Sequence, residues 1–155
     1  MKILLFCAIL FSCSHQQAVY PEWSPVTQDS LTGVYTNIGT SDPETAKQYK
    51  AVRKLTGFFW PKAKLDADAV KLTEHLGKVS VFALKGDAVI ATMELSLSDG
   101  KLIITRDGDQ EGVTYRMVEK FHRNKEGLVV ETTTKTTGIF AIGPDTRNWH
   151  LFMLQ

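Results

Sequence analysis

An alternation of apolar and polar residues, interrupted by short glycine-containing turns, is the feature that most limits how this chain can fold. Within residues 89–98, apolar side chains at the odd positions alternate with polar ones such as Thr92, Glu94 and Ser96. Successive side chains of a strand point to opposite faces, so the pattern predicts an antiparallel sheet with one face in water. Residues 85–87, 98–100 and 124–127 have the composition of the intervening turns.

The same reasoning, applied to the whole chain, predicts a mainly β domain with one helix after the first strand. Ser41 or Asp42 can cap that helix, apolar residues recur up to Leu55, and Gly57 is expected to end it. An antiparallel meander of this length must close or curl, which predicts an up-and-down barrel or a bent half-barrel. We expect about eight strands, at residues 31–37, 70–75, 78–84, 88–97, 101–106, 112–123, 128–134 and 149–154.

The N-terminus carries a short apolar run that ends in a cysteine. Lys2 precedes the run Ile3–Phe11, and small Ser12 stands directly before Cys13. A helix of this run would rise only about 13 Å, much less than the roughly 30 Å of a bilayer core. An uncleaved transmembrane helix is therefore disfavoured, whereas ordinary secretion, with cleavage elsewhere, stays open.

Residues 10–13, Leu-Phe-Ser-Cys, resemble the lipobox of bacterial lipoproteins. The resemblance implies removal of residues 1–12 and a diacylglycerol thioether, with an acylated amine, on Cys13. Because Cys7 would be removed with the signal peptide, no intrachain disulfide is predicted. Ser14 follows the cysteine where inner-membrane lipoproteins often carry Asp, which favours the periplasmic face of the outer membrane of a Gram-negative bacterium.

The chain divides into three parts: a signal peptide at 1–12, a lipidated N-terminus and tether at 13–29, and one β domain at 30–155. Pro21 and Pro25 favour an extended tether. Its aromatic side chains, Tyr20 and Trp23, are expected to dock onto the domain, with the lipid headgroups as the alternative. Without Lys2 the chain has 17 basic and 17 acidic residues, which argues against nucleic-acid binding and against electrostatic anchoring to lipid.

In the first predicted strand, Gly33-Val34-Tyr35 is similar to the Gly-x-Trp motif of lipocalins, with Tyr in place of Trp. The early helix is similar to the lid of fatty-acid-binding proteins, whereas the helix of lipocalins follows the barrel. The resemblance implies a lipocalin-like shape for residues 30–155 and transfers no binding residue to this chain. More generally, the chain resembles small envelope lipoproteins of Gram-negative bacteria.

None of the polar groupings predicts a metal, a cofactor or an enzyme. Asp107–Gly112 begins like a calcium loop, but Val118 stands where the twelfth-position acid is required, so a polar hairpin turn is predicted. No Gly-x-Ser-x-Gly elbow is present. The four histidines lack metal-ligand spacing; they are His15, His75, His122 and His150. Three glutamates in predicted strands are expected to face solvent: Glu94, Glu119 and Glu131.

Three further segments allow two interpretations each. Phe58 and Phe59 are expected in the core, with a ligand-facing patch as the alternative. The composition of Thr132–Thr137 predicts an edge strand, in which Lys135 would prevent pairing with other chains. The alternative is a surface lined by hydroxyl groups that contacts peptidoglycan or another glycan. The segment Thr137–Arg147 has apolar residues that would be costly to expose without a partner, or it forms another strand with a Gly-Pro turn.

Two functions therefore remain open. The first is a non-enzymatic binding module that holds a small apolar ligand inside the barrel or at its open end. The alternative is a protein-interaction module, either an envelope assembly accessory or an inhibitor of a wall-degrading or toxic enzyme. A solidly packed interior would remove the first hypothesis; the side chains expected to fill it are Phe82, Met93, Met117, Phe121, Phe140 and Trp149.

Overall fold

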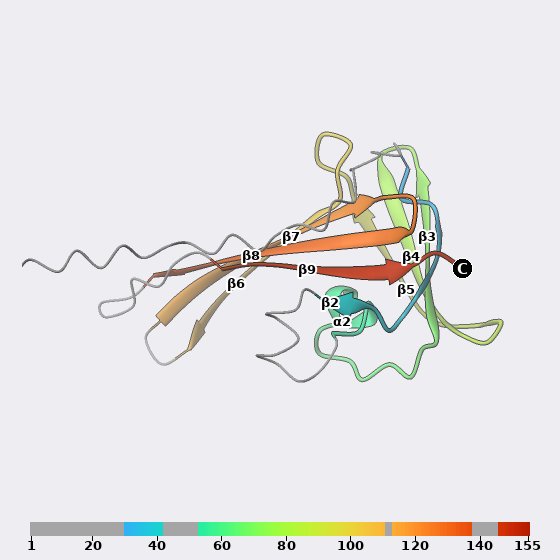
Figure 1. Cartoon of the computed structure of the whole chain (residues 1–155), viewed down its shortest axis with the longest axis horizontal. Helices are drawn as coiled ribbons and strands as arrows, with labels where there is room; N and C mark the ends of the chain where they lie inside the picture. Colours follow the sequence, from blue (N-terminus) through green and yellow to red (C-terminus); the bar gives the residue numbers. More distant parts are fainter. Residues whose placement is uncertain (1–29, 42–52, 111–112, 138–145) are drawn as a thin grey trace, which may run out of the picture.

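The computed structural model describes residues 30–41, 53–110, 113–137 and 146–155 (Figure 1). The signal peptide, Cys13, the tether, most of the expected helix and the apolar part of the 137–147 segment lie outside these residues. Within them the chain forms nine strands, and a mainly β fold is confirmed. The expected strands are present with ends shifted by a few residues, and the two-residue strand β2 (Thr40–Ser41) adds to the number expected.

The strands form two antiparallel sheets. The four-stranded sheet has the order β1 (Gly33–Thr36), β3 (Ala69–His75), β4 (Lys78–Lys85), β5 (Ala88–Ser96). The five-stranded sheet has the order β2, β9 (Thr146–Met153), β8 (Gly127–Thr137), β7 (Val113–Arg123), β6 (Ile103–Gln110). Neighbouring strands in each sheet are mostly neighbours in the chain, as expected for a meander.

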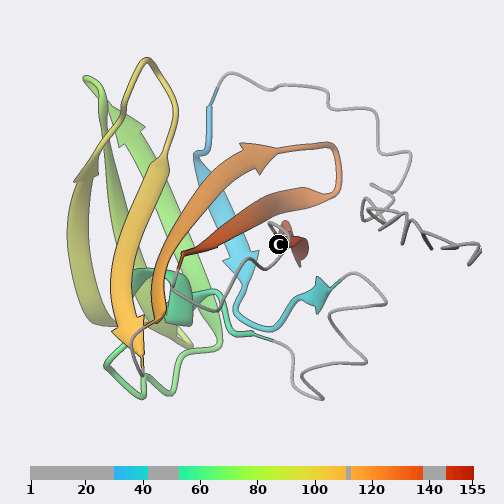
Figure 2. The ribbon, with the colours of Figure 1, turned by 90° about the vertical axis from the view of Figure 1, so that its left-hand side faces the viewer.

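The expected closed barrel is not formed. β5 and β6 follow one another in the chain, yet each ends its own sheet and the two do not pair (Figure 2). Their apolar faces approach the same core, with Met93 and Leu95 on β5 and Ile104 on β6. The two strands therefore diverge around the core after the turn closed by the Ser98–Lys101 bridge. On the other side, a single bridge between Tyr35 and Leu154 connects the sheets.

The predicted alternation along β5 is confirmed from Ala91 to Ser96, where half-buried and exposed side chains follow one another. A bulge opposite Ala83 and Leu84 interrupts the pairing, because Ala83 pairs with Ala91 and Leu84 with Val89. The extra residue changes the phase of the alternation. Val89, expected on the apolar face, is consequently 53% exposed.

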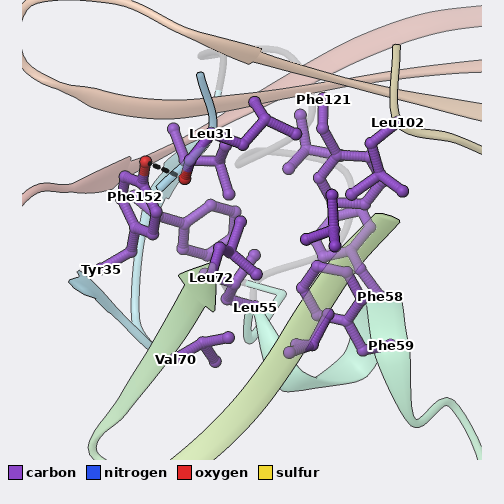
Figure 3. Close-up of a cluster of buried hydrophobic side chains, with 14 residues drawn as sticks. Leu31, Tyr35, Leu55, Phe58, Phe59, Val70, Leu72, Leu102, Phe121 and Phe152 are labelled. Atoms are coloured by element: carbon purple, nitrogen blue, oxygen red, sulfur yellow. Dashed lines mark hydrogen bonds between the residues drawn. The ribbon is translucent and has the colours of Figure 1, made fainter. Parts of the chain in front are cut away.

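Side chains from both sheets and from helix α2 (Thr56–Phe59) fill the space between the sheets (Figure 3). Tyr35 is fully buried and donates a 2.7 Å hydrogen bond to the carbonyl of Leu31. Phe58 and Phe59 are buried, so their expected place in the core is confirmed. The 14 members of this core cluster are Leu31, Tyr35, Leu55, Phe58, Phe59, Val70, Leu72, Val79, Val81, Leu102, Phe121, Leu128, Val130 and Phe152.

Gly57 does not end a helix, as the sequence led us to expect, but lies inside α2. The reason is a buried side chain far along the chain, Asn37. Its Oδ1 accepts a 2.9 Å hydrogen bond from the backbone N–H of Thr56, and its Nδ2 donates to the carbonyl of Ala67 at 2.8 Å. This bridge starts the helix at Thr56 and holds it against the core.

The five-stranded sheet has two halves with different environments. In the core half, formed by residues 119–123, 127–132 and 149–153, most side chains are buried. In the distal half, formed by residues 105–109, 113–118, 133–137 and 146–148, all are exposed or half-exposed. Figure 1 shows this distal half extending well beyond the four-stranded sheet. β8 lies between β9 and β7 as far as Thr134, so the prediction of an edge strand is wrong for Thr132–Thr134. Among the described residues, Lys135–Thr137 pair with β7 alone.

Candidate functional site

A buried carboxylate lies where the core half of the five-stranded sheet meets the distal half. Glu119 on β7 is opposite Ile104 on β6, and Arg106 on β6 is opposite Met117 on β7. Directly paired residues share a face of the sheet, so Arg106 and Glu119 are diagonal neighbours on the face that carries Phe121. This inner face packs against α2 and the four-stranded sheet. The side chain of Glu119 is 0% exposed, and the prediction that it faces solvent is wrong.

Two arginines bind this carboxylate, one at each oxygen. Arg53, just before α2, places Nη2 2.8 Å from Glu119 Oε1 in an ion pair without hydrogen-bond alignment. Arg106 donates from Nη1 to Glu119 Oε2 and from Nη2 to the carbonyl of Phe58. Arg106 thereby joins α2 to the sheet. The partner charges offset the cost of burying Glu119, which would be large for an unpaired carboxylate.

Arg53 also lies over an aromatic ring. Its Cζ is 3.8 Å from the centroid of Phe58, a cation–π geometry. Burial lowers the pKa of Arg53 and the nearby Arg106 acts in the same direction, whereas Glu119 opposes the shift. An arginine nevertheless keeps its proton in proteins, so the site holds two positive charges and one negative charge.

Phe58 also contacts a histidine. His150 on β9 is nearly buried, and its ring centroid is 5.4 Å from that of Phe58. Its Nδ1 lies 2.7 Å from the hydroxyl oxygen of Ser41, the residue paired with it on β2. The ring is thus oriented by the neighbouring strand. Phe58 therefore contacts both the arginine–glutamate group and the serine–histidine pair.

The histidines that the structure describes do not meet. His122 and His150 lie on β7 and β9, with β8 between them, and they occupy opposite faces of the sheet. His122 Nε2 is 3.8 Å from a carboxylate oxygen of Glu131. Burial lowers the pKa of His122, with nearby cationic groups acting in the same direction and Glu131 opposing the shift. His75 ends β3 in the other sheet, and His15 lies outside the described residues.

The other two strand glutamates differ from each other. Glu94 is exposed, as predicted, and forms an ion pair with Lys78. Glu131 is 7% exposed and accepts a 2.7 Å hydrogen bond from Arg147 Nε. It lies on the outer face, beside the small apolar cluster of Val129, Trp149 and Leu151. The expectation that Glu131 is solvated is therefore wrong, because these neighbours cover it.

The calcium-like segment lies mostly within a strand. Asp107 and Asp109 belong to β6, and the two residues at 111–112 lie outside the described chain. Asp107 accepts hydrogen bonds from Arg116 Nε at 2.7 Å and Nη2 at 3.1 Å. These bonds lower the pKa of Asp107. The part of the chain described here contains no group of three His, Cys, Asp or Glu residues arranged to hold a metal ion.

No family model, curated protein or solved structure matches this chain. Among the described residues, no helix has the length and apolar character needed to span a bilayer.

Sequence reasoning missed Arg53 and Arg106 and misplaced Glu119. The burial of Glu119 could have been inferred from its position in the alternation along β7. Phe121 is a natural core residue, and Glu119 is two positions earlier, hence on the same face. The arginines gave no such signal, because Arg53 precedes a four-residue helix and Arg106 lies in a strand that was expected to end there.

Proposed function

We propose that the protein is a lipid-anchored, periplasm-facing interaction module of the outer membrane, without enzymatic activity. Its partner would be an envelope protein, bound by the distal half of the five-stranded sheet. The observation that carries this proposal is the exposure of that half: four strands pair there, yet its side chains are exposed or half-exposed. A surface of paired strands whose side chains are open or half-open to solvent is suited to a partner.

The polar character of the distal half supports a protein partner. On its outer face, Asp107, Arg116 and Lys135 follow one another across three strands. Thr114 and Thr137 form the next pair, and both are exposed. Mixed charges and hydroxyls suit a reversible interface, in which polar groups provide specificity.

The 137–147 segment adds a second argument from chain continuity. β8 ends at Thr137 and β9 begins at Thr146, so the intervening segment leaves from the tip of the distal half. Its apolar residues, Ile139, Phe140 and Ile142, lie outside the described chain. Apolar residues of this kind are typical anchors of protein interfaces, and we include them in the proposed interface.

The competing hypothesis of a small apolar ligand has weaker support. Of the side chains expected to fill a solidly packed interior, Phe121 belongs to the core cluster, Met117 lies beside Arg53, and Trp149 belongs to the outer cluster. Met93 packs against the core cluster, and Phe82 alternates with buried Val81 on β4. The space between the sheets is occupied by the 14 side chains of the core cluster.

The anchor is tested separately from the interface. Intact mass of protein extracted from membranes should show loss of residues 1–12 and added acyl mass on Cys13. A chain that retains Met1, or an unmodified Cys13, would remove the anchored part of the proposal. The lipid itself should suffice for attachment, since each buried methylene contributes about 0.8 kcal/mol.

Site-specific photo-cross-linking in intact cells tests the interface. A photoreactive amino acid at Thr114 or Thr137 should give a discrete cross-linked species, identifiable by mass spectrometry. Lys71 on β3, exposed on the four-stranded sheet, is the matched control. Equal cross-linking from Lys71, or none from either threonine, would contradict the proposed surface.

A further inference from the structure

The arginine pair around Glu119 contains more positive charge than its partner neutralises. We propose that Arg53 and Arg106 form a binding site for the carboxylate group of a small organic acid, on the inner face of the five-stranded sheet. This site is distinct from the outer-face surface of the distal half, and it does not depend on the proposed interaction function.

The first argument is the charge on this face. The inner-face positions of β6 to β9 follow from the register, which places Arg106, Met117 and Thr134 in one row and Ile104, Glu119 and Thr132 in the next. Among the described residues of these strands, Glu119 is the only acid at an inner-face position. Two guanidinium groups therefore share one carboxylate, leaving a net charge of one.

Arg53 and Arg106 have more N–H donors than the acceptors around them use. Each guanidinium has five N–H donors. Arg106 uses donors on Glu119 and on the carbonyl of Phe58. Arg53 has its ion pair, a 3.5 Å contact with the carbonyl of Gly57 and a 4.0 Å contact with the sulfur of Met117. Among the described residues, the remaining N–H groups of the two arginines have no acceptor.

The third argument is the direction from which the site can be reached. Glu119 is 0% exposed, whereas the side chains of Arg53 and Arg106 are 31% and 24% exposed. The carboxylate is thus shielded from solvent, whereas both arginine side chains are partly open to it. Their partial burial strengthens an interaction with an anion, because screening by water is reduced.

A buried hydroxyl beside the site provides an independent sign of an unfilled position. Thr132 on β8 is directly opposite Glu119 and only 5% exposed. Its Oγ1 has no hydrogen-bond partner within the described structure. Buried polar atoms are normally paired, so an unpaired hydroxyl at this place is consistent with a missing partner.

The chemistry favours a carboxylate over a more highly charged anion. A single negative charge balances the net charge of the two arginines and Glu119. The planar fork of a guanidinium matches the two oxygens of a carboxylate. Because the side chains of Arg53 and Arg106 are only 31% and 24% exposed, a small acid is a better fit than a bulky acidic segment of a protein.

The test is a titration of the full chain, purified in detergent and labelled with nitrogen-15, followed through the arginine Nε–Hε signals. Benzoate and acetate are the probes, sodium chloride at equal ionic strength is the salt control, and inorganic phosphate is the competing anion. The signals of Arg53 and Arg106 should shift saturably with the carboxylates. Their assignment follows from R53K and R106K.

Three variants make the expected result specific. R106Q should weaken benzoate binding about tenfold, the effect of losing a charge-assisted hydrogen bond. E119Q preserves the shape of the side chain and removes its negative charge, so it should tighten benzoate binding several-fold. This result tests the site even if R106Q fails to fold. R116Q is the matched control, because Arg116 is an exposed arginine on the outer face, and its binding should be unchanged.

Several results would overturn the proposal. These are the absence of a saturable shift at Arg53 and Arg106, unchanged binding in E119Q, or an equal loss in R116Q. Phosphate bound as tightly as benzoate would overturn the assignment to a carboxylate. None of these results depends on cross-linking at Thr114 or Thr137, so the failure of this site and the failure of the proposed interface are distinguishable.

Discussion

The core half and the distal half of the five-stranded sheet are continuous along the same strands, yet their side chains have different roles. β7 and β8 are 11 residues each, whereas the strands of the four-stranded sheet have between four and nine. Beyond the core half, the longer strands continue to pair although their side chains are exposed or half-exposed. Backbone pairing can therefore extend a sheet past its core, and burial then decides which part stabilises the fold.

The largest expected difference in stability between the two halves concerns two aromatic residues on one face of β7. F121A should lower the free energy of unfolding by about 4 kcal/mol, because Phe121 is buried in the core cluster. Y115A, in the distal half, should cost only about 1 kcal/mol. Tyr115 covers Gly108 across the strands, so some packing is still lost. Urea unfolding measures both, and equal losses would contradict the division of the sheet.

The next largest effect concerns the boundary between the halves. E119A should destabilise the protein by about 2–3 kcal/mol, since it leaves two partly buried guanidinium groups without their counter-charge. The matched variant E94A removes an exposed glutamate paired with Lys78 and should change stability by less than about 0.5 kcal/mol. Thermal and urea unfolding compare the two. Similar values would mean that Glu119 contributes no more than a surface carboxylate.

A smaller effect is expected at Tyr35, which belongs to the core. Y35F should cost about 1 kcal/mol at neutral pH, because the carbonyl of Leu31 loses its donor.

The same variant has a pH signature. Burial raises the pKa of Tyr35 above its ordinary value of 10.0, with Arg123 opposing the shift. The unfolded chain therefore releases the proton first as the pH rises. The stabilisation is complete below the unfolded pKa and is lost as the pH rises through the higher folded value. Melting temperatures measured from neutral pH upward should fall less steeply for Y35F than for the wild type, whereas Y115F should follow the wild type.

The smallest effect is expected in the distal half. R116A removes an ion pair with Asp107 in which both side chains are more than half exposed, so stability should barely change. Thermal unfolding at low and high salt should show little difference. A loss comparable with that of E119A would indicate that the distal half also stabilises the fold.

Much of the secondary structure could be predicted from the sequence, because strands and turns leave local patterns. The alternation on β5 and the turn at Asp99-Gly100 correspond to the observed elements. The end of β6 could not be predicted, since Asp107 and Asp109 have the composition of a turn. Pairing with β7 keeps them in a strand, where tertiary context overrides local preference.

The candidate site was predicted less well than the fold. Phe58 was correctly expected in the core from its aromatic neighbourhood. Arg53 and Arg106 are 53 positions apart in the sequence, and they belong to no common motif or repeat. Only the packing of α2 on β6 and β7 brings them to one carboxylate. Long-range contacts of this kind leave no periodic pattern in a single sequence.

Local sequence patterns specify the β class, the positions of most strands and the residues that turn between them, because these depend on backbone geometry and on alternation over a few residues. Tertiary structure decided that β5 and β6 separate instead of closing a barrel, that β8 is central, and that Glu119 is buried while Glu94 is not. The physical reason is that burial and sheet order depend on which distant surfaces meet. That free-energy balance is shared by the whole domain and is not encoded in any one segment.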